Sequence, residues 1–312
     1  MSEAHEVIMI GAGPTSLSAA IYTTREDIET LLLEKGVTGG LAAITDWVDN
    51  YPGFPEGVAG LELAQKLEAQ AERFGAKIQP AEVISIAKDK DEIVLQTSDG
   101  EMKAKAVLVA TGSDYKRLGI PGEEEYYAKG VHFCATCDGA FYRDKRLVVV
   151  GGGNSAVQEA IFLTRYASHI DMLVRKDHMR ASDVLQKELA KHKGKITVHF
   201  NTTTDEILAK DGKVVGVAGT HDGKEKVTFD TDGVFIFIGL KPNTEFLKSS
   251  GIELDEIGLI KTDLHLQTSI PGIFAAGDVR SGATMQIASA SGEGATAALE
   301  IRHYLENLER SK

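Results

Sequence analysis

A strand, a glycine-rich turn, a helix and a second strand follow one another twice in this chain, and this repeat constrains the fold more than any other feature. In the first copy the segments are residues 6–10, Gly11-Ala12-Gly13-Pro14-Thr15-Ser16, residues 17–24 and residues 30–33, followed by Glu34. The glycines let the backbone approach a pyrophosphate, whose charge the start of the helix stabilises. Ser16 replaces a common third glycine and is small enough to keep helix and strand close. Glu34 would accept hydrogen bonds from ribose hydroxyls and repel a 2′-phosphate, so this turn suits FAD or NAD.

The second copy comprises residues 146–150, Gly151-Gly152-Gly153-Asn154-Ser155-Ala156, residues 157–165 and residues 170–174. Arg175 and Lys176 follow its second strand at the place that an acid holds in the first copy, and Arg180 comes one helical turn later. Cationic side chains at this place favour the 2′-phosphate of NADPH. The alternative is a solvated run of charge. Two such units predict an α/β chain in which two nucleotides meet.

Short β-rich stretches separated by turns lie between and after the two units. Residues 93–96 and residues 214–218 are bounded by Asp-Gly turns and predict small antiparallel meanders that cap each nucleotide domain. Residues 106–110 and residues 233–238 each run into a glycine, and we expect each to close the parallel sheet of its domain. Residues 297–312 are rich in Glu, Arg and Leu and predict a surface helix.

Composition excludes several classes of function. The chain has 312 residues, of which 43% are hydrophobic, and this length allows about two domains. No segment approaches the roughly 18 uninterrupted apolar residues of a membrane helix. Residues 1–5 are polar and show no signal-peptide pattern, so we expect a cytoplasmic protein. A net charge of −12 argues against nucleic acid as a partner.

The chain's two cysteines are three positions apart, in Cys134-Ala135-Thr136-Cys137. A disulfide across so short a loop gains only about 2 kcal/mol from chain entropy, so the pair indicates chemistry rather than a structural staple. Cys-x-x-Cys in a reducing compartment indicates thiol–disulfide exchange. Asp138 follows directly and would take and return the proton that accompanies thiolate formation. Zinc needs about four ligands, so we expect no metal, and we interpret His132 as a packing or hydrogen-bonding residue.

Together these motifs resemble one family closely, the low-molecular-weight thioredoxin reductases. The likeness covers nearly the whole chain and rests on the segments above together with Asn50-Tyr51-Pro52-Gly53-Phe54, Ala110-Thr111-Gly112, Asp138-Gly139 and Thr268-Ser269-Ile270-Pro271-Gly272-Ile273-Phe274-Ala275-Ala276-Gly277-Asp278. The resemblance implies two Rossmann-like three-layer dinucleotide-binding domains. An NADPH domain at residues 115–242, which carries the cysteines, would be inserted into an FAD domain made of residues 1–114 and 243–312. It also implies a homodimer, and a rotation of the NADPH domain about crossings near Ser113 and Pro242.

The resemblance further implies which residues bind the cofactors. Asp278 would contact the ribityl chain of the flavin, and Gln286-Ile287-Ala288, at a helix start, would lie against its ring. The flavin-site residues expected in this way are Gly11, Gly13, Pro14, Thr15, Ser16, Glu34, Lys35, Gly40, Leu41, Thr45, Asn50, Val83, Ala110, Thr111, Gly112, Gly277, Asp278, Gln286, Ile287 and Ala288. Those expected at the NADPH site are Gly151, Gly153, Asn154, Ser155, Ala156, Arg175, Lys176, Arg180, Ile238 and Gly239.

The reaction that the resemblance implies runs from NADPH to FAD, to the Cys134–Cys137 disulfide and then to thioredoxin. Cys137 would face the flavin and Cys134 would react with the protein substrate. Four places depart from the family pattern. Val174-Arg175-Lys176 replaces a run with a His and two Arg, Met285 replaces an Arg, Leu41 replaces a Gln, and Ala140 replaces an aromatic residue that helps to dock thioredoxin.

Three alternatives to this reaction stay open on the sequence. The first is a reductase of a glutaredoxin-like protein or a small disulfide, with NADPH or another electron donor. The second is a flavoprotein that senses NAD(P)H without turnover. The third is a ferredoxin–NADP reductase, although that lineage lacks the Cys-x-x-Cys.

Overall fold

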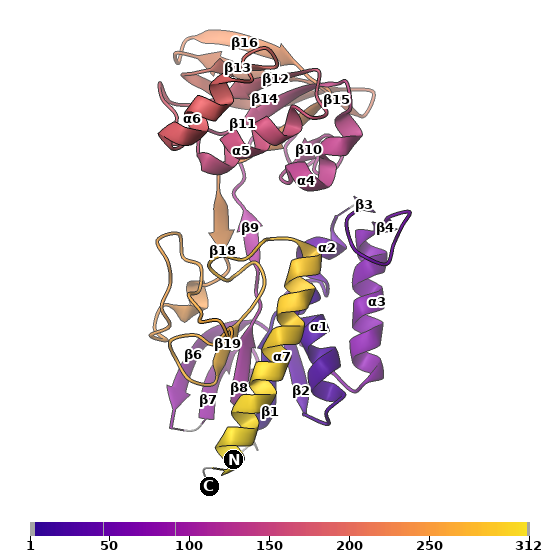
Figure 1. The fold of residues 1–312 in the computed structure, drawn as a ribbon, viewed down its shortest axis with the longest axis vertical. Helices are drawn as coiled ribbons and strands as arrows, with labels where there is room; N and C mark the ends of the chain where they lie inside the picture. The colour runs from indigo at the N-terminus through magenta and orange to yellow at the C-terminus, as the bar shows by residue number, and fades with distance from the viewer. Residues whose placement is uncertain (1–3, 46, 91, 311–312) are drawn as a thin grey trace. The chain divides into compact units, whose positions relative to one another are not determined.

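The computed structural model describes residues 4–45, 47–90 and 92–310, and the chain divides into two compact units (Figure 1). Unit 1 comprises Met1–Asp114 and Lys241–Lys312, and unit 2 comprises Tyr115–Leu240. The chain passes between the units through β9 (Ser113–Tyr115) and β18 (Leu240–Pro242), and these two strands pair with each other. Each unit contains one copy of the repeat.

Unit 1 is built on a seven-stranded sheet whose centre comes from the first repeat. The order is β5-β2-β1-β8-β7-β6, with β19 also paired to β8. Strand β7 pairs antiparallel with both β8 and β6, and all the other pairings are parallel. The strands are β1 (His5–Ile10), β2 (Thr30–Glu34), β5 (Lys77–Pro80), β6 (Val83–Asp89), β7 (Glu92–Thr97), β8 (Gly100–Val109) and β19 (Ile273–Ala275). A separate hairpin pairs β3 (Trp47–Val48) with β4 (Val58–Ala59). The apolar sequence of β1 fits a central strand that is covered on both faces.

Strand β8 does not close the sheet, contrary to the expectation from the sequence. It lies inside the sheet, because its ten residues are long enough to pair with two strands along one edge. Its first half pairs with β7, and its last residues pair with β19, while β1 occupies its other edge. The meander is therefore continuous with the parallel sheet rather than a separate cap.

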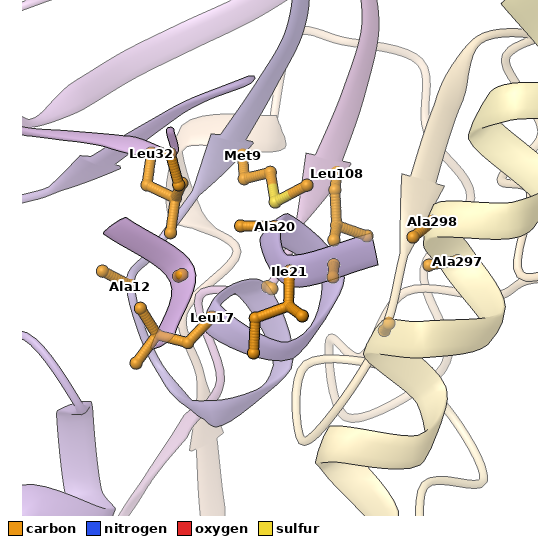
Figure 2. Close-up of a cluster of buried hydrophobic side chains, with 14 of the residues drawn as sticks. Met9, Ala12, Leu17, Ala20, Ile21, Leu32, Leu108, Ala297 and Ala298 are labelled. Carbon is orange, nitrogen blue, oxygen red and sulfur yellow. The ribbon is translucent and has the colours of Figure 1, made fainter. Parts of the chain in front are cut away.

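Helices cover one face of this sheet. They are α1 (Pro14–Thr24), α3 (Gly60–Arg73) and α7 (Ile287–Arg310), and the unit also contains the short helices α2 (Gly40–Ala43) and η2 (Glu245–Leu247). Figure 2 shows Met9 and Leu108 of the sheet facing Leu17 and Ile21 of α1, with Ala297 of α7 nearby, and all of these side chains are buried. Burial of this apolar surface is the main force that fixes the helices on the sheet.

The C-terminal helix corrects a second expectation. Residues 297–312 were predicted as a surface helix, but α7 begins at Ile287, and Ala297 and Ile301 are fully buried. Gly294 lies so close to α1 that a Cβ there would collide with the carbonyl oxygen of Thr15. The many Glu and Arg side chains of this helix concealed an apolar stripe with helical spacing.

Unit 2 contains a five-stranded parallel sheet in the order β10-β17-β11-β12-β13 and a three-stranded antiparallel meander, β14-β15-β16. The strands are β10 (Val131–His132), β11 (Arg146–Val150), β12 (His169–Leu173), β13 (Ile196–His199), β14 (Thr202–Lys210), β15 (Lys213–His221), β16 (Glu225–Asp230) and β17 (Gly233–Ile236). The helices are α4 (Ala135–Asp138), η1 (Gly139–Tyr142), α5 (Asn154–Leu163) and α6 (Asp183–Ala190). Contrary to expectation β17 does not close the sheet, because β10, which leads to the cysteines, pairs with its free edge.

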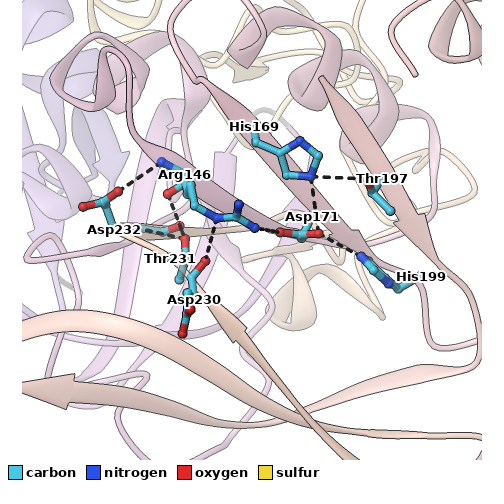
Figure 3. A network of polar contacts seen from close by, with 9 residues as sticks. Arg146, His169, Asp171, Thr197, His199, Asp230, Thr231 and Asp232 are labelled. Atoms are coloured by element: carbon cyan, nitrogen blue, oxygen red, sulfur yellow. Dashed lines mark hydrogen bonds and ion pairs between the residues drawn. The ribbon is translucent and has the colours of Figure 1, made fainter. Parts of the chain in front are cut away.

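A polar network links three neighbouring strands of this sheet (Figure 3). The buried carboxylate of Asp171 accepts hydrogen bonds from Arg146 Nη2 at 3.0 Å and from His199 Nε2 at 2.9 Å, and His169 Nε2 lies 3.5 Å from it. These partners compensate the cost of burying a carboxylate.

Candidate active site

The first glycine turn leaves open space at the start of α1. Gly11 has a φ of +95°, and a Cβ on it would lie 2.6 Å from the carbonyl oxygen of Ala110, so only glycine fits there. A Cβ on Gly13 would meet nothing within 4 Å. Pro14 is the first residue of α1, and no described side chain caps this helix. Its free backbone N–H groups and the open space suit the pyrophosphate of a dinucleotide.

Glu34, at the end of β2, is bonded to this turn. Its Oε2 accepts a hydrogen bond of 2.7 Å from the N–H of Ala12, and its Oε1 accepts one of 2.7 Å from the N–H of Gly36. Each carboxylate oxygen keeps lone-pair capacity for a ribose hydroxyl. The neighbouring Lys35 is exposed and pairs with Glu82 at 3.7 Å, and Val83 is buried in β6.

Four buried side-chain polar atoms of unit 1 have no hydrogen-bond partner within the described ranges, and two of them belong to residues expected at the flavin. These two are Ser16 Oγ, in the first turn of α1, and Asp278 Oδ1. Gly277, beside Asp278, packs on Thr15, where a Cβ would collide with its hydroxyl. Burial, reinforced by the charge of Glu293, raises the pKa of Asp278 to about 6. An unpaired buried carboxyl is costly unless a ligand satisfies it, so these atoms fit the polar chain of a flavin dinucleotide.

The structure brings together Asn50 and Gln286, which are 236 positions apart in the chain. The Asn50 Nδ2 donates to Gln286 Oε1 at 3.0 Å, and Gln286 Nε2 donates to the carbonyl of Met285 at 2.9 Å. Ile287 begins α7 directly after them, and Ala288 follows. Thr45 Oγ1 donates to the carbonyl oxygen of Leu41 at 2.8 Å, next to Gly40 in α2.

Sequence reasoning missed three residues that hold this region in place. Arg280 Nη2 lies 2.6 Å from Glu293 Oε1, and Glu293 Oε2 also accepts from the N–H of Gly277 at 2.8 Å. Asn243 Nδ2 donates to the carbonyl oxygen of Thr111 at 3.0 Å, and the Asn243 N–H donates to Gly112. A charged residue two positions after Gly277-Asp278, and a Glu within the small-residue run of residues 288–298, were the available signals.

The second glycine turn has the same form in unit 2. Gly151 has a φ of +145°, and a Cβ there would lie 2.8 Å from Cβ of the buried Ala156, while a Cβ on Gly153 would meet nothing within 4 Å. Helix α5 begins at Asn154, and Ser155 beside it is exposed. The turn therefore has room for a second pyrophosphate.

Three exposed cations lie in the segment that follows β12, on the C-terminal side of this second turn. The backbone N–H of Arg180 donates to the carbonyl oxygen of Gly152 at 2.7 Å, which ties its loop to the turn. Arg175 and Lys176 follow β12, and within the described residues none of the three cations has an ion-pair partner. Ile238 and Gly239 follow β17, where Ile238 is half-buried. Unpaired cations beside a glycine turn suit a phosphorylated ribose.

The redox pair is a disulfide between Cys134 and Cys137, whose Cα atoms lie 5.4 Å apart. The N–H of Cys137 lies 3.2 Å from Cys134 Sγ, a contact that would stabilise a thiolate on Cys134. Asp138 Oδ2 lies 3.1 Å from His132 Nδ1, and His132 Nε2 lies 2.6 Å from the Tyr142 hydroxyl. His132 is therefore a hydrogen-bonding residue, as expected, but its partner is the proposed proton carrier.

The described residues contain no cluster of three or more side chains that would hold a metal ion. Within the same ranges, no helix is both long and apolar enough to cross a membrane.

Comparison with known proteins shows the family of this chain. The pyridine nucleotide-disulphide oxidoreductase family matches residues 5–294. The chain belongs to this family. A thioredoxin reductase of Bacillus subtilis is 42% identical over 309 residues, which cover 98% of this chain and 96% of that protein. A 34.2 kDa protein in the rubredoxin operon of Clostridium pasteurianum is 41% identical over 301 residues, which cover 96% of this chain and 97% of that protein.

Solved structures agree with this membership. The crystal structure of thioredoxin reductase from Streptococcus pyogenes matches with a TM-score of 0.92 at 40% identity and covers 97% of this chain and 99% of that chain. These relatives place the chain among the thioredoxin reductases of the family and confirm the expected α/β fold with two dinucleotide-binding domains. Family members are oxidoreductases that use a flavin and a pyridine nucleotide.

Proposed function

We propose that this chain is an NADPH-dependent thioredoxin-disulfide reductase that carries FAD. The observation that carries the proposal is the Cys134–Cys137 disulfide with Asp138 directly after it, in the unit that also holds the second glycine turn. A half-buried disulfide beside a carboxyl group suits thiol–disulfide exchange with a protein substrate. A thioredoxin is the substrate that the relatives' names indicate.

Residues of unit 1 would hold FAD. The Gly11–Gly13 turn would bind the pyrophosphate and Glu34 a ribose, while Asp278 would accept a hydrogen bond from the ribityl chain. Asn50 and Gln286 would lie at the flavin ring. When bound, the flavin supplies the two-electron transfer to a disulfide that a pyridine nucleotide performs poorly by itself.

Residues of unit 2 would hold NADPH. The Gly151–Gly153 turn would bind its pyrophosphate, and Arg175, Lys176 and Arg180 would bind its 2′-phosphate. All three cations are exposed and none has an ion-pair partner among the residues described. A charge-assisted bond to phosphate is stronger than a neutral one, so NADPH would be preferred over NADH.

The disulfide then passes electrons to the substrate by two exchanges. Reduction opens the Cys134–Cys137 bond with two electrons and two protons. The Cys134 thiolate attacks one sulfur of the substrate disulfide, and the Cys137 thiolate attacks the mixed disulfide, which releases the reduced substrate and restores the original bond. We place this reaction in the cytoplasm, where disulfides are transient, and in a homodimer, as the family resemblance implies.

Anaerobic titration and steady-state turnover test the proposal together. We expect NADPH to bleach the flavin absorbance at much lower concentration than NADH, and we expect NADPH consumption to depend on added thioredoxin. Cys134→Ser and Cys137→Ser should each lower thioredoxin reduction by about 1,000-fold or more while NADPH still bleaches the flavin. Full thioredoxin turnover in either variant would contradict the proposal.

A second candidate keeps the chemistry and changes the substrate to a glutaredoxin-like protein or a small disulfide. Ala140 favours it, because it is exposed beside Phe141 at the place where an aromatic residue would aid docking. Turnover with such a substrate at a higher kcat/KM than with thioredoxin would establish it.

A further inference from the structure

The buried His132 connects the redox helix to a second hydroxyl group. Its Nδ1 lies 3.1 Å from Asp138 Oδ2, and its Nε2 lies 2.6 Å from the Tyr142 hydroxyl. The three residues come from the consecutive elements β10, α4 and η1, and Asp138 directly follows Cys137. A hydrogen-bonded chain therefore runs from Tyr142 through His132 to the carboxyl group beside the disulfide.

Aromatic rings separate His132 from water. The ring of Phe235 stacks on it at 5.1 Å between centroids, and the ring of Tyr142 meets it edge-on at 5.3 Å. The His132 side chain is 6% exposed, whereas that of Asp138 is 20% exposed. A buried imidazole exchanges protons only through its hydrogen-bonded neighbours, so its route toward the disulfide passes through Asp138.

Tyr142 lets the imidazole change its protonation without losing a hydrogen bond. A tyrosine hydroxyl oxygen can accept a hydrogen bond, so it accepts from the Nε2 proton both before and after Nδ1 gives up its own proton. Burial and the charges of Asp138 and Asp232 raise the pKa of Tyr142, which keeps the hydroxyl protonated. His132 can thus keep its hydrogen bond to Tyr142 while Nδ1 exchanges a proton with Asp138.

We propose that His132 is a positioning residue that orients Asp138 and holds the proton that Asp138 delivers to the redox cysteines. Opening the disulfide with two electrons leaves two thiolates, which need two protons. One of them moves from Nδ1 of the imidazolium to Asp138 and from there to a thiolate, while the remaining ring proton stays on Nε2 against the Tyr142 oxygen; the second proton comes from solvent. When the dithiol reduces a substrate disulfide, the attacking cysteine returns its proton to His132 by the same route, the other cysteine's proton passes to one substrate sulfur, and the second substrate sulfur takes a proton from solvent. This inference rests on the proposed disulfide reduction.

Other charged and titratable groups lie near the three hydrogen-bonded residues Tyr142, His132 and Asp138. Tyr127 lies near Asp138, whose charge contributes to raising its pKa, although burial is the larger cause and Arg117 opposes it. Arg117 lies over the rings of Tyr127 and Phe133. The charge of Asp232, in the loop before β17, contributes to raising the pKa of Tyr142. None of these groups bonds to His132 within the described residues, where its hydrogen-bond partners are Asp138 and Tyr142.

Thiol alkylation tests the proposal without nicotinamide nucleotide or thioredoxin. The purified flavoprotein is reduced with dithiothreitol, and its reaction with iodoacetamide is followed by mass spectrometry from pH 5 to pH 9. The chain has only two cysteines, so each added mass reports one of them. The midpoint of the rate profile then measures how the surroundings favour the thiolate.

We expect His132→Gln to move this midpoint upward by about half a pH unit or more, because glutamine keeps a donor to Asp138 but cannot hold the proton that offsets its charge. Asp138→Asn should move the midpoint downward, because it removes the negative charge itself. His199→Gln is the matched control: His199 also bonds a carboxylate, at 2.9 Å, but lies on the strand at the opposite end of the sheet order from β10 (Figure 3). It should leave the midpoint unchanged.

A folded His132→Gln protein with the wild-type profile would overturn the proposal and leave His132 with a packing role. Tyr142→Phe provides a second test, because it removes one hydroxyl and keeps the ring. It should shift the midpoint upward by a smaller amount, and an unchanged profile would again count against the relay. Failure of thioredoxin turnover would reject the proposed function and leave this profile intact, so the two failures are distinguishable.

Discussion

Glu34 accepts a hydrogen bond of 2.7 Å from the N–H of Ala12, so the acid that would select the ribose also braces the first glycine turn. The two residues belong to different segments of the repeat and meet because β1 and β2 are parallel neighbours. The carboxylate of Glu34 therefore both holds the glycine turn in shape and places a negative charge where the ribose of the dinucleotide would bind.

Glu34→Gln should weaken retention of FAD. Bonds to a charged acceptor are worth about 1.5–3 kcal/mol, and the amide keeps the shape but loses the charge. The ratio of flavin absorbance to protein absorbance after gel filtration measures the loss. Glu62→Gln, which changes an exposed acid of α3 that pairs with Lys66 on the same helix, should keep the wild-type ratio.

Asp278→Asn should change the stability of the flavin-free protein in a pH-dependent way. The folded pKa of Asp278 is raised from 3.8 to about 6, so the folded chain binds this proton more tightly, and the charged carboxyl destabilises it increasingly as pH rises through that window. The shift corresponds to a destabilisation of up to about 3 kcal/mol above pH 6. Urea unfolding should show the variant to be more stable at pH 8 and equal to wild type near pH 4. An equal gain at both values would contradict the assignment.

Arg180→Ala should weaken the use of NADPH and spare the use of NADH. Loss of one charge-assisted bond to the 2′-phosphate should raise KM for NADPH by about 10-fold, since tenfold corresponds to about 1.4 kcal/mol. Steady-state kinetics with both donors measures this selectivity. Lys187→Ala on α6 removes another exposed cation and should change neither KM. An equal rise in KM for both donors would contradict this, because it would mean that the substitution disrupts the Gly151–Gly153 turn rather than a contact with the 2′-phosphate.

Ile301→Ala should destabilise unit 1, because Ile301 is fully buried in the core that α7 shares with α1. Truncation of a buried isoleucine costs about 2–5 kcal/mol. Leu299, two residues earlier on the same helix, is 38% exposed, and Leu299→Ala should cost less than about 1 kcal/mol. Thermal melting of the two variants compares them directly, and equal losses would restore the surface-helix interpretation.

The resemblance to thioredoxin reductases was visible in short motifs, because each motif acts through residues close together in the chain. A glycine turn before a helix and two cysteines three positions apart already define their local geometry. The C-terminal helix was misjudged for the same reason. Its buried face is decided by contact with α1, hundreds of residues earlier, whereas its composition reflects mainly the exposed face.

The sequence by itself therefore determined the two βαβ units, the redox cysteine pair and the family. Tertiary structure alone decided which distant side chains complete each site. Asn50 meets Gln286, Glu293 bonds to Gly277, and His132 is enclosed by Phe235 beside Asp138. The physical reason is that hydrogen bonds and burial depend on which strands and helices become neighbours, and sheet order brings together residues that no local pattern relates.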